Sequence, residues 1–308
     1  MKVTIEAAGY RPVKKGEKAG ICCCSNGQKR ENQPQIEKLV KVLDEIGIEA
    51  VLSPWIYADA SGRAAEAKER AQALMDFYRD PEIKIIFDIS GGDLANEILP
   101  YLDYDLIRKS SKQFYGYSDL SVILNALYTK SGVSSGLYQI RNIVRNCAEK
   151  QILDVRKSIL KEEVSVDGLF CCEADVLQGE ELLADGLSGT LAGGNIRCFL
   201  KLAGTSYWPD VTGKILLLES LGGEAPRIVT GFAQLFQMGV FDQVKGVILG
   251  TFTELEQAEN QPSVWELLKP FVPEALPIMK TPQIGHGSNS KALMIGGRVS
   301  IRSEEISD

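Results

Sequence analysis

The first half of the chain alternates short apolar segments with segments of helical periodicity, and this alternation constrains the fold more than any other feature. Strands are predicted at residues 19–24, 48–52, 83–89 and 114–117. Helices are predicted at residues 34–46, 63–78 and 120–130. Strands that alternate with helices form a mostly parallel sheet with helices on both faces. We therefore expect an α/β fold, in which a ligand binds beyond the carboxyl ends of the strands.

The second half resumes the strand and helix patterns. Strands are predicted at residues 186–192, 214–218, 244–249, 292–295 and 298–302. Helices are predicted at residues 226–238 and 264–271. The last two strands are separated by Gly296 and Gly297, a two-glycine signal that is typical of a β-hairpin.

The length of 308 residues favours two domains, at roughly 100 to 200 residues each. The pattern weakens and becomes charged between residues 140 and 181, so we place the inter-domain connection there. We expect an N-terminal α/β domain at residues 1–160 and a C-terminal domain at residues 175–308.

Charge, hydropathy and cysteine spacing exclude several kinds of partner. The formal net charge is -7 and no Lys/Arg run occurs, so we expect neither a nucleic-acid polymer nor a membrane as partner. No segment approaches the ~20 apolar residues of a membrane span, and the pattern of residues 1–10 leads us to expect no secretory signal. Three of the seven cysteines are consecutive, Cys22 to Cys24, and no C-x-x-C occurs. We interpret the cysteines as small buried residues of a cytoplasmic protein, and we expect no metal and no cofactor.

Two polar segments follow predicted strands, where the active edge of the sheet should lie. In the segment 116–119, Ser118 stands between a strand and a helix, the context of a nucleophile elbow. Alternatively, Ser118 is a plain helix cap. Gly91 and Gly92 follow the strand at 83–89, and one of their N–H groups could complete an oxyanion hole. Alternatively, they form a tight turn that requires positive φ.

His286 is the only histidine, and it lies in a loop between Gly285 and Gly287 that could aim its ring. A single histidine excludes a histidine-rich zinc site. Glu219 ends an apolar strand and either orients an imidazole or is a solvated strand end. Asn195 either caps a helix, which we favour, or binds a ligand.

Four segments occur in a characteristic order: IKIIFDISGGDLANEILPYLD at 83–103, GYSDLSVILNALYTKSG at 116–132, KILLLESLGGEAPR at the start of 214–254, and GHGSNSKALMIGG at 285–297. Together they resemble the LD-carboxypeptidase family of serine peptidases over most of the chain. The resemblance implies that Ser118 is the nucleophile, His286 the general base and acid, and Glu219 the orienting carboxylate. It also implies an oxyanion hole made by the backbone N–H groups of Gly92 and Asp119.

The resemblance further implies a smaller β-rich C-terminal domain, an active site in the cleft between the domains, and a homodimer. Family members cleave the L,D amide that links terminal D-alanine to a murein tetrapeptide during cytoplasmic wall recycling. A related branch confers immunity by cleaving microcin C-type aminoacyl nucleotide conjugates. We add Gly91 and Asn195 as candidates for substrate binding.

The substrate stays open because one loop departs from the family pattern. Residues 90–94, Ser-Gly-Gly-Asp-Leu, stand where wall-recycling members carry an Arg-Gly-Gly-Tyr-Gly-like stretch. Glu224, in the GEAPR segment, favours the peptidase branch. Two hypotheses of other kinds remain, a catalytically inactive peptide-binding protein and a cysteine hydrolase that uses Cys24 with His286.

Overall fold

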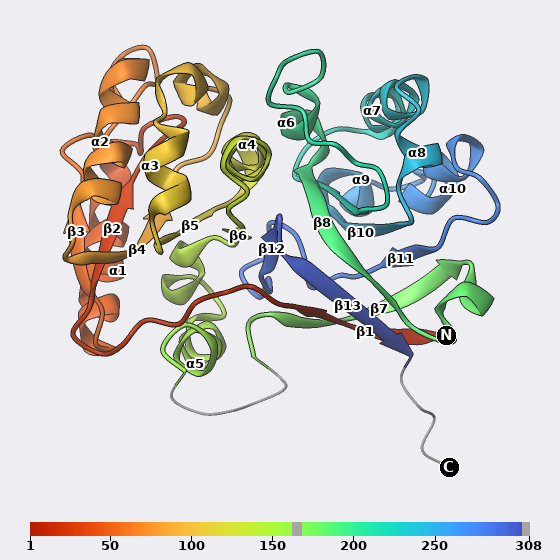
Figure 1. Ribbon diagram of the computed structural model, residues 1–308, viewed down its shortest axis with the longest axis horizontal. Coiled ribbons are helices and arrows are strands. Elements are labelled where there is room, and N and C mark those ends of the chain that lie inside the picture. The colour runs from red at the N-terminus through yellow and green to blue at the C-terminus, as the bar shows by residue number, and fades with distance from the viewer. Residues whose placement is uncertain (162–167, 304–308) are drawn as a thin grey trace.

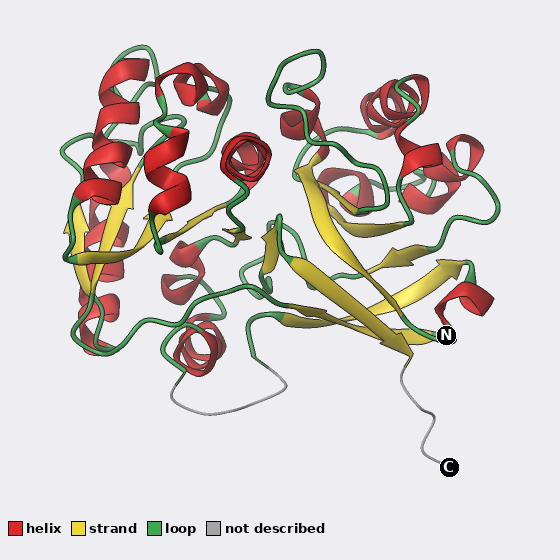
Figure 2. Cartoon of the chain, in the orientation of Figure 1, coloured by secondary structure: helices red, strands yellow, loops and turns green. Residues whose placement is uncertain are grey.

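The structure, a computed structural model, describes residues 1–161 and 168–303. Part of the expected inter-domain connection at residues 140–181, namely residues 162–167, lies outside the described residues. Two β-sheets lie side by side, a six-stranded open sheet and a closed barrel of seven strands (Figure 1). The open sheet has helices packed against it, and further helices lie on the outside of the barrel (Figure 2). Among the described residues, every helix is too short or too polar to cross a membrane.

The open sheet has the expected α/β character. Its strands, in spatial order, are β12 (Leu293–Ile295), β6 (Ser135–Leu137), β5 (Gln113–Gly116), β4 (Ile83–Asp88), β2 (Lys18–Cys22) and β3 (Glu49–Leu52). All neighbours pair in parallel except β12 and β6, which are antiparallel. Strands of a parallel sheet are covered on both faces, which explains why nearly every residue of β4 and β5 is buried.

The barrel contains most of the second half of the chain. Its strands, in spatial order, are β1 (Lys2–Ala7), β13 (Arg298–Ser303), β8 (Leu187–Asn195), β9 (Ile215–Ser220), β10 (Gly246–Phe252), β11 (Ile278–Lys280) and β7 (Cys171–Gln178). The parallel strands β8 to β11 form one side, and antiparallel pairing through β7, β1 and β13 closes the barrel.

Ten α-helices occur among the described residues. They are α1 (Gln33–Glu45), α2 (Ala67–Arg79), α3 (Tyr104–Lys109), α4 (Ser121–Ser131), α5 (Ala148–Ser158), α6 (Ile196–Leu200), α7 (Ala225–Gln237), α8 (Val240–Gln243), α9 (Thr253–Gln257) and α10 (Val264–Leu268). α2 packs closely on β2, because a Cβ at Gly20 would lie 2.7 Å from the ring of Phe77. Glycine at this position therefore sets how near the helix can approach the sheet.

Each sheet contains one strand that comes from the half of the chain that mainly forms the other sheet. β1, at the N-terminus, pairs with β13 and β7 in the barrel, whereas β12, near the C-terminus, pairs with β6 in the open sheet. In Figure 1 the red β1 lies beside the blue β13. The two halves of the molecule are consequently joined by several chain crossings.

The predicted hairpin at residues 292–302 is wrong. β12 and β13 flank Gly296 and Gly297 as expected, but they belong to different sheets. Gly296 has a φ of 76°, and its N–H donates to Leu191 O of β8. The glycines thus turn the chain out of one sheet and into the other, because β6 and β8 supply better-placed partners than the two strands supply to each other.

We predict that Ile5→Ala lowers the free energy of unfolding by about 2–5 kcal/mol. Ile5 is fully buried in β1, opposite Ile301 and Cys172, so truncation leaves a cavity in the barrel wall. Urea unfolding followed by circular dichroism measures the effect. The matched control is Glu6→Ala on the same strand, whose side chain is 37% exposed, with an expected change within about 0.5 kcal/mol. Equal losses in the two variants would contradict a structural role for β1.

Candidate active site

Ser118 lies at a sharp turn between β5 and α4. Tyr117 is extended, Ser118 has a φ of 59°, and a short 3₁₀ helix (Ser118–Leu120) leads into α4. Positive φ is unfavourable for a residue with a side chain and persists where the surroundings impose it. The turn is tight enough that a Cβ at Gly116 would lie 2.6 Å from Leu120 Cβ. Ser118 does not cap the helix, so the conformation is that of a nucleophile elbow.

His286 lies against the end of β9, where Glu219 is located. His286 Nδ1 is 2.9 Å from Glu219 Oε2, an ion-pair distance, although the direction of the contact does not meet hydrogen-bond geometry. Glu219 is fully buried within β9, so it is not a solvated strand end. A carboxylate at this position can fix the orientation of an imidazole and stabilise its protonated form.

The histidine loop approaches β10 closely because two positions lack side chains. A Cβ at Gly250 would lie 2.5 Å from Ile284 O, and a Cβ at Gly285 would lie 1.7 Å from Thr251 Oγ1. The backbone is also joined there, since Thr251 N donates to Ile284 O at 2.7 Å. These contacts place the residue after Gly285 beside Glu219.

Tyr117 covers the histidine from the nucleophile side. Its ring contacts the ring of His286 edge-on, with centroids 4.9 Å apart and an interplanar angle of 74°. Burial, together with the nearby charge of Glu219, raises the pKa of the Tyr117 phenol well above its ordinary value, so the phenol is neutral. Tyr117 belongs to the segment 116–119 in which a site was expected, but its contact with His286 was not predicted.

One pocket of about 210 Å³ brings Ser118 and His286 together with the glycine loop. Its lining comes from both halves of the chain: Ser90, Gly91, Gly92, Tyr117, Ser118, Gln139, Arg141, Asn142, Arg145, Leu221, Gly285, His286 and Gly287. His286 Nε2 is buried without a hydrogen-bond partner among the described residues, the Ser118 hydroxyl included. Hydrogen bonds between catalytic groups are often long in the absence of substrate. Asn195 does not line the pocket; its side chain caps α6 by accepting from Cys198 N.

Gly92 occupies a loop that is held from two sides. Its φ is 114°, and a Cβ there would lie 2.3 Å from Asn26 Oδ1. Asn26 Oδ1 accepts from Asp93 N at 2.8 Å, and Arg197 of α6 donates to Gly92 O at 2.9 Å and forms an ion pair with Asp93. The N–H of Gly92 has no protein acceptor in residues 1–161 and 168–303, and neither does that of Asp119. Neither N–H group is therefore committed to another group in the described part of the chain.

The side chain of Asp119 ties this loop to the nucleophile turn. Its carboxylate is fully buried and accepts from Ser25 Oγ at 2.6 Å and from Ala95 N at 2.8 Å. It also forms an ion pair with Lys201, which follows α6. The backbone of Asp119 was expected to contribute, whereas this role of its side chain was not predicted.

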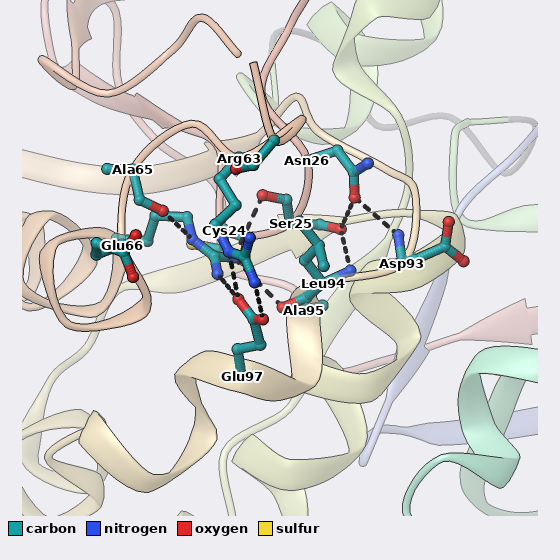
Figure 3. A network of polar contacts seen from close by, with 12 residues as sticks. Cys24, Ser25, Asn26, Arg63, Ala65, Glu66, Asp93, Leu94, Ala95 and Glu97 are labelled. Atoms are coloured by element: carbon teal, nitrogen blue, oxygen red, sulfur yellow. Dashed lines mark hydrogen bonds and ion pairs between the residues drawn. The ribbon is translucent and has the colours of Figure 1, made fainter. Parts of the chain in front are cut away.

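Arg70 of α2 holds the loops that follow β2 and β4. From the sequence alone it could not be told from any other arginine in a helix. Its guanidinium is fully buried and donates to Cys24 O at 2.6 Å and to Leu94 O at 3.3 Å. It is paired with Glu97, which also pairs with Arg63 at 2.8 Å. Figure 3 shows this network beside the Ser25–Asn26–Asp93 hydrogen bonds.

Cys22, Cys24 and Asp88 are the described residues whose arrangement is compatible with a metal ion. Their ligand atoms lie within 4.8 Å of one another, and all three are buried. Burial raises the pKa of the Cys22 thiol well above its ordinary value. The hydrogen bond with Cys22 lowers the pKa of Cys24, but burial and the charge of Asp88 outweigh it and raise the pKa to about 11. Protonated thiols and a carboxylate that accepts from Cys24 N and Ser90 N fit a hydrogen-bonded cluster better than a ligand set.

All seven cysteines are free thiols, and Cys24 is fully buried. Because a thiolate is the reactive form, a buried thiol with a raised pKa is a poor nucleophile. The hypothesis of a cysteine hydrolase built on Cys24 is therefore not supported.

Comparison with known proteins agrees with this geometry. Residues 19–139 match the LD-carboxypeptidase N-terminal domain, and residues 188–301 match the LD-carboxypeptidase C-terminal domain. The probable murein peptide carboxypeptidase of Bacillus subtilis is 24% identical, over 96% of this chain and 92% of that protein. The microcin C7 self-immunity protein MccF of Escherichia coli is 25% identical, over 78% of this chain and 77% of that protein.

A solved structure extends the likeness to the fold. The crystal structure of muramoyltetrapeptide carboxypeptidase from Oxalobacter formigenes superposes with a TM-score of 0.76 at 25% identity, covering 93% of this chain and 95% of the other. Both halves of the chain therefore match, in order, the two domains of one family. The protein belongs to the LD-carboxypeptidase family.

Proposed function

We propose that the protein is a serine peptidase that hydrolyses the L,D amide linking terminal D-alanine to a murein tetrapeptide. The observation that carries this proposal is the position of Ser118, at a strained elbow in the same pocket as the one histidine, whose Nδ1 is 2.9 Å from a buried glutamate. Backbone strain clusters at active sites, and a buried carboxylate beside an imidazole can orient the ring, so their coincidence supports a Ser118–His286–Glu219 triad.

In the proposed reaction, Ser118 Oγ attacks the scissile carbonyl carbon while His286 accepts the hydroxyl proton. The oxyanion is bound by the N–H groups of Gly92 and Asp119. The C–N bond then breaks, His286 gives its proton to the departing amine, and D-alanine leaves an acyl-enzyme on Ser118. Water then attacks the ester carbonyl carbon while His286 takes a proton from the water. The bond between that carbon and Ser118 Oγ breaks, His286 returns the proton to Ser118 Oγ, and the shortened peptide leaves with a new terminal carboxyl group.

We also propose that residues 1–160 and 175–308 act as the two domains, with the active site in the cleft between them. The mixed lining of the pocket and the contacts of Arg197 and Lys201 with residues 92–93 support this division. β1 and β12 would be the strands that each domain lends to the other. A cytoplasmic homodimer that acts in wall recycling completes the proposal.

A second candidate substrate is an aminoacyl nucleotide conjugate, because the chain is about as similar to the microcin immunity protein as to the murein peptidase. The residue pattern of the loop at 90–94 also leaves this alternative open. We expect faster D-alanine release from an L,D-tetrapeptide than cleavage of an aminoacyl sulfamoyl nucleoside. Measuring both by liquid chromatography with one enzyme preparation decides between them, and the reverse order of rates would replace the murein proposal.

We predict that Ser118→Ala and His286→Ala each lower kcat by at least about 10³-fold, since each removes a group that the triad needs. A fluorophosphonate probe should label the wild-type protein at Ser118 and leave Ser118→Ala unlabelled. Ser134→Ala, outside the pocket, is the matched control and should keep both activity and labelling.

Thermal unfolding of each variant separates loss of chemistry from loss of fold. Turnover in Ser118→Ala would contradict the serine mechanism. Saturable binding of the tetrapeptide without turnover in the wild-type protein would indicate instead an inactive peptide-binding protein.

A pair of adjacent glycines tests the oxyanion hole. Gly92→Ala should lower kcat by about 10²–10³-fold, because the added Cβ meets Asn26 and alanine disfavours the native φ of 114°. Both effects would move the N–H of residue 92 out of place. Gly91→Ala should cost less than about tenfold, since a Cβ there meets no atom within 4 Å. The test measures kcat for both variants and compares the two values. Equal losses of kcat would contradict a role for the Gly92 N–H in the oxyanion hole.

A further inference from the structure

Two arginines in the catalytic pocket lack an anionic partner. Arg141 and Arg145 line the pocket with Ser118 and His286. Arg141 donates to the neutral Gln28 side chain at 2.9 Å, its Nε is buried with no partner, and Arg145 donates to Asn142 at 3.4 Å. Neither guanidinium pairs with a carboxylate in the part of the chain that the structure describes.

This arrangement is unfavourable for the protein alone. Burial, and the positive charge of Arg145, lower the pKa of Arg141 to about 10, and burial lowers the pKa of Arg145. The other buried or clustered arginines near the site have carboxylates: Arg70 pairs with Glu97 and Arg197 with Asp93. A desolvated charge without a counter-ion is costly, so a counter-ion from outside the chain is expected at this position.

The local fold holds both arginines at the pocket. Arg141 lies within a 3₁₀ turn (Ile140–Val144) that follows β6, and Arg145 directly follows this turn. Gln139 caps the turn by accepting from Arg141 N at 3.3 Å. Ile140 and Ile143 are buried and anchor the turn. β6 neighbours β5, so the turn lies at the same edge of the sheet as the Ser118 elbow.

We infer that Arg141 and Arg145 bind an oxyanion that the substrate carries next to its scissile nitrogen. The inference rests on the proposed function, since a carboxypeptidase substrate has its free carboxylate on the carbon bonded to that nitrogen. A planar guanidinium matches a carboxylate or a phosphoryl group with two parallel hydrogen bonds. A pocket of about 210 Å³ holds little more than one amide and the groups bonded to it. The arginines and Ser118 would therefore contact the same terminal residue of the substrate.

The consequence is a requirement for a free terminal acid. We expect wild-type kcat/KM to be on the order of 100-fold higher for the L,D-tetrapeptide than for its C-terminal carboxamide. In Arg141→Ala and Arg145→Ala this ratio should fall toward one, chiefly because KM for the free acid rises. Arg108→Ala, which removes an exposed arginine paired with Asp105 on α3, is the matched control and should keep the wild-type ratio.

If the two arginines only stabilise the fold, the alanine variants should behave differently. They would show a lower unfolding temperature and an unchanged ratio of acid to amide, which would overturn the inference. Arg145→Lys adds a further test, because a lysine restores charge without the planar pair of donors and should recover only part of the preference. A wild-type enzyme that cleaves acid and amide equally well would also overturn it.

Binding measurements separate this inference from the proposed function. Isothermal titration of Ser118→Ala with N-acetyl-D-alanine, its amide and inorganic phosphate requires no turnover. Binding of either anion, lost in the Ser118→Ala/Arg145→Ala double variant, supports the anion site even if the wild-type protein hydrolyses no peptide. Tighter binding of phosphate than of the carboxylate would assign the site to a phosphoryl group. Absence of anion binding in an active peptidase would reject the anion site alone.

Discussion

The buried carboxylate of Asp119 connects the parts of the molecule on which the pocket depends. Its backbone forms the turn after β5, and its side chain accepts from Ser25 and Ala95, which follow β2 and β4. The same group pairs with Lys201, which follows a helix outside the barrel. Because a buried charge that loses a partner is strongly destabilising, these segments are held as one unit. The nucleophile turn and the glycine loop therefore keep a fixed relation that neither has by itself.

The strands that carry the site were largely predictable from the sequence. The strand predicted at residues 83–89 is Ile83–Asp88 in the structure, and the helix predicted at 120–130 is Ser121–Ser131. Such segments are long apolar runs that end in glycine or a polar turn, so local preference and tertiary burial agree. The local signals at Ser118 allowed two interpretations, a nucleophile elbow and a plain helix cap. The structure distinguishes them by the φ of 59° and by the lack of a side-chain cap hydrogen bond.

The remaining parts depend on partners that are distant in the sequence. The two-glycine signal at 296–297 is local, whereas the choice between a hairpin and two sheets is made by β6 and β8. β1 was missed, although Val3, Ile5 and Ala7 alternate with polar residues as a strand buried on one face should. Arg70 could not be found in this way, since the carbonyl groups that it binds lie on loops that only the fold brings together.

The site concentrates features that oppose folding. Ser118 has positive φ. Within the described residues, two arginines line the pocket without a counter-ion, and buried nitrogen atoms of His286 lack hydrogen bonds. Strain at one residue costs of the order of 1–3 kcal/mol, a large part of the net stability of a domain. These features persist because the apolar strands around them and the paired Arg70 and Asp119 clusters hold the loops in place. A substrate with an anionic group would pair with the arginines, and its scissile carbonyl would bond to Ser118. The features that destabilise the free protein would therefore favour the complex with substrate.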